Sequence, residues 1–84
     1  MTAAEWRAFW KQRGMRELEE LLPAGYEPYA TRVATLLGSR ASNGALAAEL
    51  GRIRGDELGL PPDPHADAAA AGTITHWFEG AAGR

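Results

Sequence analysis

The chain has 84 residues, of which 45% are hydrophobic and 24% charged, a composition typical of one small globular domain. The absence of Cys excludes disulfides and thiolate metal sites, and no apolar run reaches the roughly 18 residues of a membrane span. The net charge of −2 lacks the basic surplus of most nucleic-acid binders. The N-terminus also lacks the order of a signal peptide, so we expect a cytoplasmic protein.

The first helix is predicted over residues 3–22. Thr2 and Glu5 have the spacing of a capping box, in which each side chain bonds the backbone amide of the other residue. Gly14 interrupts the helix and predicts a bend or a close helix crossing, and Pro23 ends the element. The apolar residues recur with a helical period and predict its buried side: Trp6, Phe9, Trp10, Leu18, Leu21 and Leu22.

The second helix is predicted over residues 28–37, with Pro28 in its first turn and Gly38 as a left-handed cap. A third helix is predicted over residues 43–54, capped by Ser42 or Asn43. Glycines weaken its last turn, so its end is predicted only to within residues 51–58. The residues expected to point inward from these two helices are Tyr29, Val33, Leu36, Leu37, Leu46, Leu50 and Ile53.

The fourth helix is predicted over residues 64–79. Pro61 and Pro62 force an extended path before it, and Asp63 caps the helix with Pro64 in its first turn. Its buried stripe is predicted to contain Ala66, Ala70, Ile74, Trp77 and Phe78. No window alternates with period two over a strand length, so residues 1–84 are predicted to form one all-α domain, a compact four-helix bundle.

The strongest candidates for metal ligands are His65, Asp67 and His76. The two histidines lie eleven residues apart, which separates them by roughly 16 Å along a helix. Zinc needs three or four ligands that converge on one point. We therefore predict no metal and no other cofactor, and expect Asp67 to stabilise the helix N-terminus, where it could pair with His65.

Glu17, Glu19 and Glu20 could act as general acid and base only if burial separated their pKa values. A solvated face is predicted instead, with Arg13 and Arg16 compensating the carboxylates by helical pairing. The serines lack a nucleophile elbow, and the glycines match neither a P-loop nor a dinucleotide-binding fingerprint. No catalytic residue is predicted, and the chain is not expected to be an enzyme.

Three large aromatic residues close together on the first helix indicate a protein interface. Trp6, Phe9 and Trp10 offer more apolar surface than a small core readily covers, and Trp is favoured at interface hot spots. Trp10 is expected in the core, whereas Trp6 fits core and interface equally. Arg7 and Lys11 suit the rim of such a patch, whose partner would be another protein or a second copy of this chain.

The segment Ala45–Gly55 resembles part of a bacterial helix-turn-helix, in which a short helix with Ala and Leu precedes a turn Gly. Over residues 45–58 the resemblance implies that Arg52 and Arg54 lie near a groove-facing element. Arg32 and Arg40 could then contact phosphate. The pattern departs from that family at Gly55 and the following Pro61, which leave no room for a full recognition helix. A small DNA-binding regulator is therefore the alternative function.

A second resemblance covers more of the chain, through Glu5-Trp6-Arg7, Phe9-Trp10, residues 29–37 and residues 57–64. These segments are similar to small uncharacterised helical proteins of actinobacteria, a family of unknown function, and the preference for Arg over Lys fits a bacterial source. The resemblance implies no catalytic motif and no cofactor. The sequence thus favours a small non-enzymatic protein-binding module, such as an inhibitor, an immunity or antitoxin-like factor, or an adaptor.

Overall fold

The computed structural model describes residues 2–82, and every regular element in this range is helical, which confirms the all-α prediction. The α-helices are α1 (Ala3–Phe9), α2 (Met15–Leu21), α3 (Ala30–Gly38), α4 (Asn43–Arg52) and α5 (Pro64–Ala82). A π-helical turn, Trp10–Gly14, joins α1 to α2, and a second, Ile53–Glu57, extends α4. A 3-10 turn, Glu27–Tyr29, precedes α3. The chain therefore forms four helical rods.

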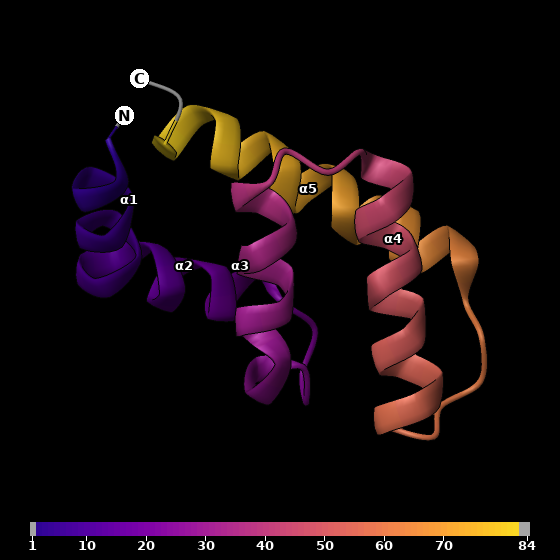
Figure 1. The fold of residues 1–84 in the computed structure, drawn as a ribbon. Helices are drawn as coiled ribbons and strands as arrows, with labels where there is room; N and C mark the ends of the chain where they lie inside the picture. The colour runs from indigo at the N-terminus through magenta and orange to yellow at the C-terminus, as the bar shows by residue number, and fades with distance from the viewer. Residues whose placement is uncertain (1, 83–84) are drawn as a thin grey trace.

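The rods are arranged so that α5 touches both ends of the molecule. In Figure 1, α5 runs behind α3 and α4, and its C-terminal part lies beside α1. The most extensive helix contact is between α4 and α5. Overall dimensions of 38 × 21 × 17 Å describe a slightly elongated body. Among the described residues, no helix combines the length and apolar content that a bilayer crossing requires.

The hydrophobic core draws on α2, α3, α4 and α5 and leaves α1 outside. Its buried members are Leu18, Leu22, Tyr26, Ala30, Val33, Ala34, Leu37, Leu46, Leu50, Ile53, Ala71 and Ile74. Most of the residues predicted to point inward are therefore buried in this core or packed against it. Leu21 is an exception, because 36% of its surface remains exposed on the last turn of α2. Since α1 contributes nothing to this core, other contacts must hold it.

Gly14 lies in the π-turn at which the chain changes direction between α1 and α2 (Figure 1). The Met15 amide donates to the Trp10 carbonyl, five residues back, so the helix continues with one extra residue in this turn. Gly14 is buried, and a Cβ atom there would lie 2.5 Å from Cε2 of Phe9. The residue is therefore small because the Phe9 ring lies directly against its backbone.

The end of α3 differs from the prediction. Gly38 stays within the helix, and Arg40 takes the left-handed conformation, with φ of 58°. The Arg40 amide donates to the Leu37 carbonyl at 3.1 Å and the Ala41 amide donates to the Leu36 carbonyl at 3.0 Å. The predicted cap at Gly38 was therefore wrong, because the chain reverses two residues later, where these two bonds close the helix.

Candidate protein-binding surface

Five aromatic side chains, here called the aromatic cluster, attach α1 to the C-terminal part of α5: Trp6, Phe9, Trp10, Trp77 and Phe78. The Phe78 ring stacks on Trp6 at a centroid distance of 5.4 Å and on Trp10 at 5.7 Å. Aromatic pairs of this kind add about 0.5–1.5 kcal/mol each beyond their buried area. The cluster therefore holds α1, which the main core does not reach.

The members of the cluster differ in burial. Phe9 is only 8% exposed, with its ring edge-on to Trp10 at 5.0 Å, so it belongs to the protein interior. Trp6, Trp10 and Phe78 are half-buried. The structure thus gives Phe9 a supporting position and leaves part of both indoles at the surface.

Two exposed cations, Arg7 and Lys11, lie on α1 and the π-turn beside the aromatic cluster. Neither makes an ion pair with any carboxylate in residues 2–82. Arg13 behaves differently: its guanidinium lies 5.6 Å from the Phe9 ring centroid and donates to the Ala81 carbonyl at 3.1 Å. The predicted pairing of Arg13 with the neighbouring glutamates was wrong, because the C-terminal end of α5 lies within its reach.

Glu17 is also not part of a solvated face. It is half-buried, and its Oε1 accepts a hydrogen bond of 2.9 Å from the Trp77 indole Nε1. This bond links α2 to α5 and satisfies the indole N–H next to the aromatic cluster. Sixty residues separate the two partners, so no local pattern in the sequence could reveal the bond.

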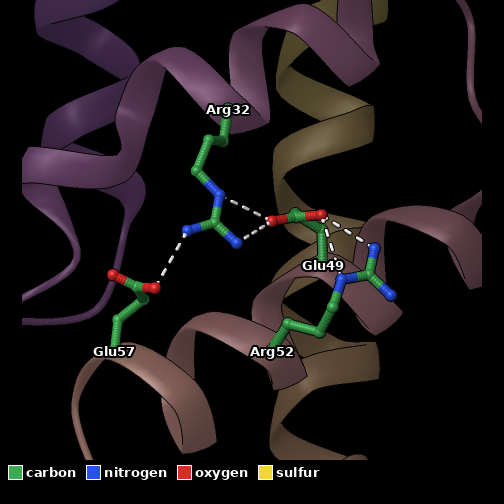
Figure 2. Close-up of polar contacts among 4 residues, drawn as sticks. All are labelled: Arg32, Glu49, Arg52 and Glu57. Carbon is green, nitrogen blue, oxygen red and sulfur yellow. Dashed lines mark hydrogen bonds and ion pairs between the residues drawn. The ribbon is translucent and has the colours of Figure 1, made fainter.

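A network of ion pairs joins α3 to α4 and to the π-turn after it (Figure 2). Arg32 Nε donates to Glu49 Oε2 at 2.8 Å, and Arg52 Nη2 donates to Glu49 Oε1 at 2.8 Å. A second carboxylate, Glu57, lies 3.6 Å from Arg32 Nη1. The Glu49 side chain is 13% exposed. Hydrogen bonds from Arg52 and then Arg32 lower the pKa of Glu49, although burial opposes the shift.

Asp67 and Arg54 form a second, more buried ion pair between α5 and the π-turn after α4. Arg54 Nε donates to Asp67 Oδ1 at 3.1 Å, with the side chains 17% and 8% exposed. Gly51 permits this approach, since a Cβ atom there would lie 3.2 Å from Asp67 Oδ2. Asp67 therefore pairs with Arg54 and not with His65, which is exposed, as is His76.

The buried hydroxyl of Tyr26 lies near this pair. Tyr26 is 2% exposed, and its oxygen has no hydrogen-bond partner among the described residues. Burial raises its pKa, with the Arg54 charge opposing and the Asp67 charge assisting the shift. The hydroxyl therefore stays neutral at physiological pH.

The four arginines of the alternative, DNA-binding interpretation differ in their partners. Arg32, Arg52 and Arg54 are held by carboxylates, and of the four only Arg40, in the loop after α3, lies exposed without an ion pair in residues 2–82. Residues 43–57 form one continuous helical rod, with Gly51 inside α4 and no turn there. The structure does not bring these arginines to one free surface.

In the described part of the chain, no three His, Asp or Glu side chains converge closely enough to hold a metal ion. One groove of about 390 Å³ lies between α4 and the start of α5, and its walls are mainly Gly, Ala and Pro. Comparisons with protein-family models, curated proteins and solved structures find no match to this chain. Its function must therefore be inferred from its own residues.

Proposed function

We propose that this chain is a small, non-enzymatic, cytoplasmic protein-binding module whose contact surface is the outer part of the aromatic cluster with Arg7 and Lys11. The observation that carries the proposal is the half-burial of Trp6 and Trp10 beside two exposed cations that make no ion pair with the described residues 2–82. Trp and Arg are the residue types most enriched where single side chains dominate a protein interface.

The stacking within the cluster supports this role. Phe78 fixes the orientation of both indoles, so little side-chain entropy remains to be lost when a partner covers them. The Phe9 ring packs edge-on against both indoles, and Gly14 lies against the Phe9 ring. A rigid surface of this kind suits an inhibitor, an immunity or antitoxin-like factor, or an adaptor, each of which acts by covering another macromolecule.

The pairing of the other arginines favours protein binding over the DNA-binding alternative. Arg52 and Arg54 would have to leave Glu49 and Asp67 before they could bind phosphate. A DNA regulator would bind duplex with strong salt dependence, and Arg52→Ala with Arg54→Ala would weaken it. Retention of the chain on duplex DNA at low salt, lost in that double variant, would favour the alternative.

The proposal is tested by retention of proteins from a lysate of the native host on the immobilised chain. We expect retained proteins to be lost with Trp6→Ala and with Arg7→Glu/Lys11→Glu, and kept with Leu60→Ala, which removes another exposed apolar side chain, 44% accessible. Circular dichroism establishes that each variant is folded. Retention of the same proteins by both surface variants and the wild type would contradict the proposed surface.

A further inference from the structure

The first rod, which consists of α1, the π-turn Trp10–Gly14 and α2, has its positive and negative charges at opposite ends. Residues 1–16 contain Arg7, Lys11, Arg13 and Arg16 against Glu5, a net charge of +3. Because the whole chain has a net charge of −2, residues 17–84 carry a net charge of −5. Residues 17–27 contain four glutamates and no Lys or Arg. One end of the rod is therefore basic, and the other end is acidic.

The exposed cations Arg7 and Lys11 have no ion-pair partner within residues 2–82. Arg7 and Lys11 are exposed, whereas Met15, after the π-turn, packs against the core and Glu19 is half-buried. In residues 2–82, Arg7 and Lys11 contact no carboxylate, and Glu19 and Glu20 contact no cation. By contrast, the arginines at 32, 52 and 54 are all paired.

The acidic end also forms a concave surface. An open hollow of about 530 Å³, here called the acidic hollow, is lined by Arg16, Glu19, Glu20, Leu22, Ala24 and Glu27. At the basic end, Ala4 and Ala8 are exposed, so another helix can approach its backbone closely. The two ends of the rod are therefore complementary in charge.

We propose that the partner of this surface is a second copy of the chain, related by a two-fold axis so that the basic end of each first rod lies on the acidic hollow of the other. Arg7 and Lys11 of each copy then face Glu19 and Glu20 of the other. Each contact is made twice, as in other isologous dimers. The inference rests on the proposed function, because it places the partner on the same face as Arg7 and Lys11.

Other anionic partners fit the observations less well. The apolar side of α1 is stacked on Phe78, so it is not free to enter a lipid bilayer. Nucleic acid would be repelled by the −5 charge on the rest of the chain. A second copy supplies a carboxylate opposite Lys11 and the acidic hollow opposite Arg7, and its own charge separation offsets that of the first copy.

The test is sedimentation equilibrium of the purified chain over a range of concentrations at low and high salt. The mass is expected to rise from the 9.0 kDa of one chain towards twice that value at low salt and to fall again at high salt. Arg7→Glu/Lys11→Glu and Glu19→Arg/Glu20→Arg should each remain monomeric. Their equimolar mixture should regain the dimer mass, because residues 1–27 then carry a net charge of −5 in one variant and +3 in the other, against −1 in the wild type.

Matched control changes are Arg40→Glu and Asp56→Arg, which reverse exposed charges away from the first rod and should leave the dimer intact. A wild-type chain that stays at 9.0 kDa up to about 1 mM overturns the inference. The inference is also overturned if either double variant still dimerises, or if the mixture of the two variants stays monomeric. The lysate experiment detects other proteins, so the proposed function can stand even if the dimer does not form. The dimer can likewise stand even if no other protein is retained from the lysate.

Discussion

Gly14→Ala tests whether the Phe9 ring requires a glycine in the π-turn. A Cβ atom at position 14 would lie 2.5 Å from Phe9 Cε2 and 2.9 Å from both Cδ2 and Cζ. The shortest of these is about 1 Å below the ordinary carbon–carbon contact of ~3.5 Å. The ring cannot simply move aside, because Trp6, Trp10, Trp77 and Phe78 surround it.

The magnitude follows from two opposing effects. Overpacking of a filled site costs about 1–3 kcal/mol, and three ring carbons in contact place this change in the upper part of that range. Replacing a helical Gly by Ala returns about 1 kcal/mol. The free energy of unfolding should therefore fall by about 1–2 kcal/mol in total, which for a domain of this size lowers Tm by roughly 4–16 °C.

Urea and thermal unfolding, followed by far-UV circular dichroism and Trp fluorescence, measure this change. Gly72→Ala is the matched control, because position 72 is inside α5 and its Cβ would meet nothing within 4 Å; it should gain about 1 kcal/mol. Phe9→Leu should relieve part of the Gly14→Ala penalty in the double variant. If Gly14→Ala proved as stable as Gly72→Ala, the close packing of Phe9 on position 14 would be refuted.

Three further changes test the loop and the ion pairs. Arg40→Gly should raise the free energy of unfolding in urea by roughly 0.5–1 kcal/mol, because glycine adopts the φ of 58° without the strain of a Cβ atom; no gain would argue against a left-handed residue there. Asp67→Ala should cost about 3–5 kcal/mol by leaving Arg54 unpaired, against at most about 1 kcal/mol for the exposed Glu57→Gln, and equal losses would contradict the burial of the pair. The lowered pKa of Glu49 stabilises the folded state above the ordinary value of 4.5, and this contribution should disappear as pH falls through the lower folded-state pKa. Urea unfolding of Glu49→Gln should thus show a flatter decline in acid than the wild type, and parallel curves would contradict the assignment.

Local features of the fold could be predicted because short segments of sequence specify them. Thr2 and Glu5 form the expected capping box, with bonds of 3.1 and 3.2 Å, and the hydroxyl of Ser42 accepts the Ala45 amide. Asp63 likewise caps α5 through the Ala66 amide. In each case a side chain bonds a backbone group three residues away, so the pattern and the contact fall within one helical turn.

The candidate surface could be predicted only in part. The three aromatic residues of the first helix form a visible group in the sequence, but their burial depends on Trp77 and Phe78, which approach only after folding. The pairing of Arg54 with Asp67 depends in the same way on the close contact of α4 with α5. Composition and spacing identify which residues are chemically suited to a surface, whereas only the fold determines which of them already have partners.

Whether an arginine already has a partner within the fold separates the charges on the first rod from those on α3 and α4. Arg32 and Arg54 each pair with a carboxylate on a neighbouring element, and Arg52 pairs with Glu49 on its own helix. On the first rod, α1 is attached through aromatic rings alone on one side, so its outer cations meet no neighbouring element. Exposed ion pairs contribute little to stability, so folding does not require Arg7 and Lys11 to be basic. If the proposed partner binds at these residues, reversing their charge should abolish association while leaving the free energy of unfolding unchanged within about 0.5 kcal/mol.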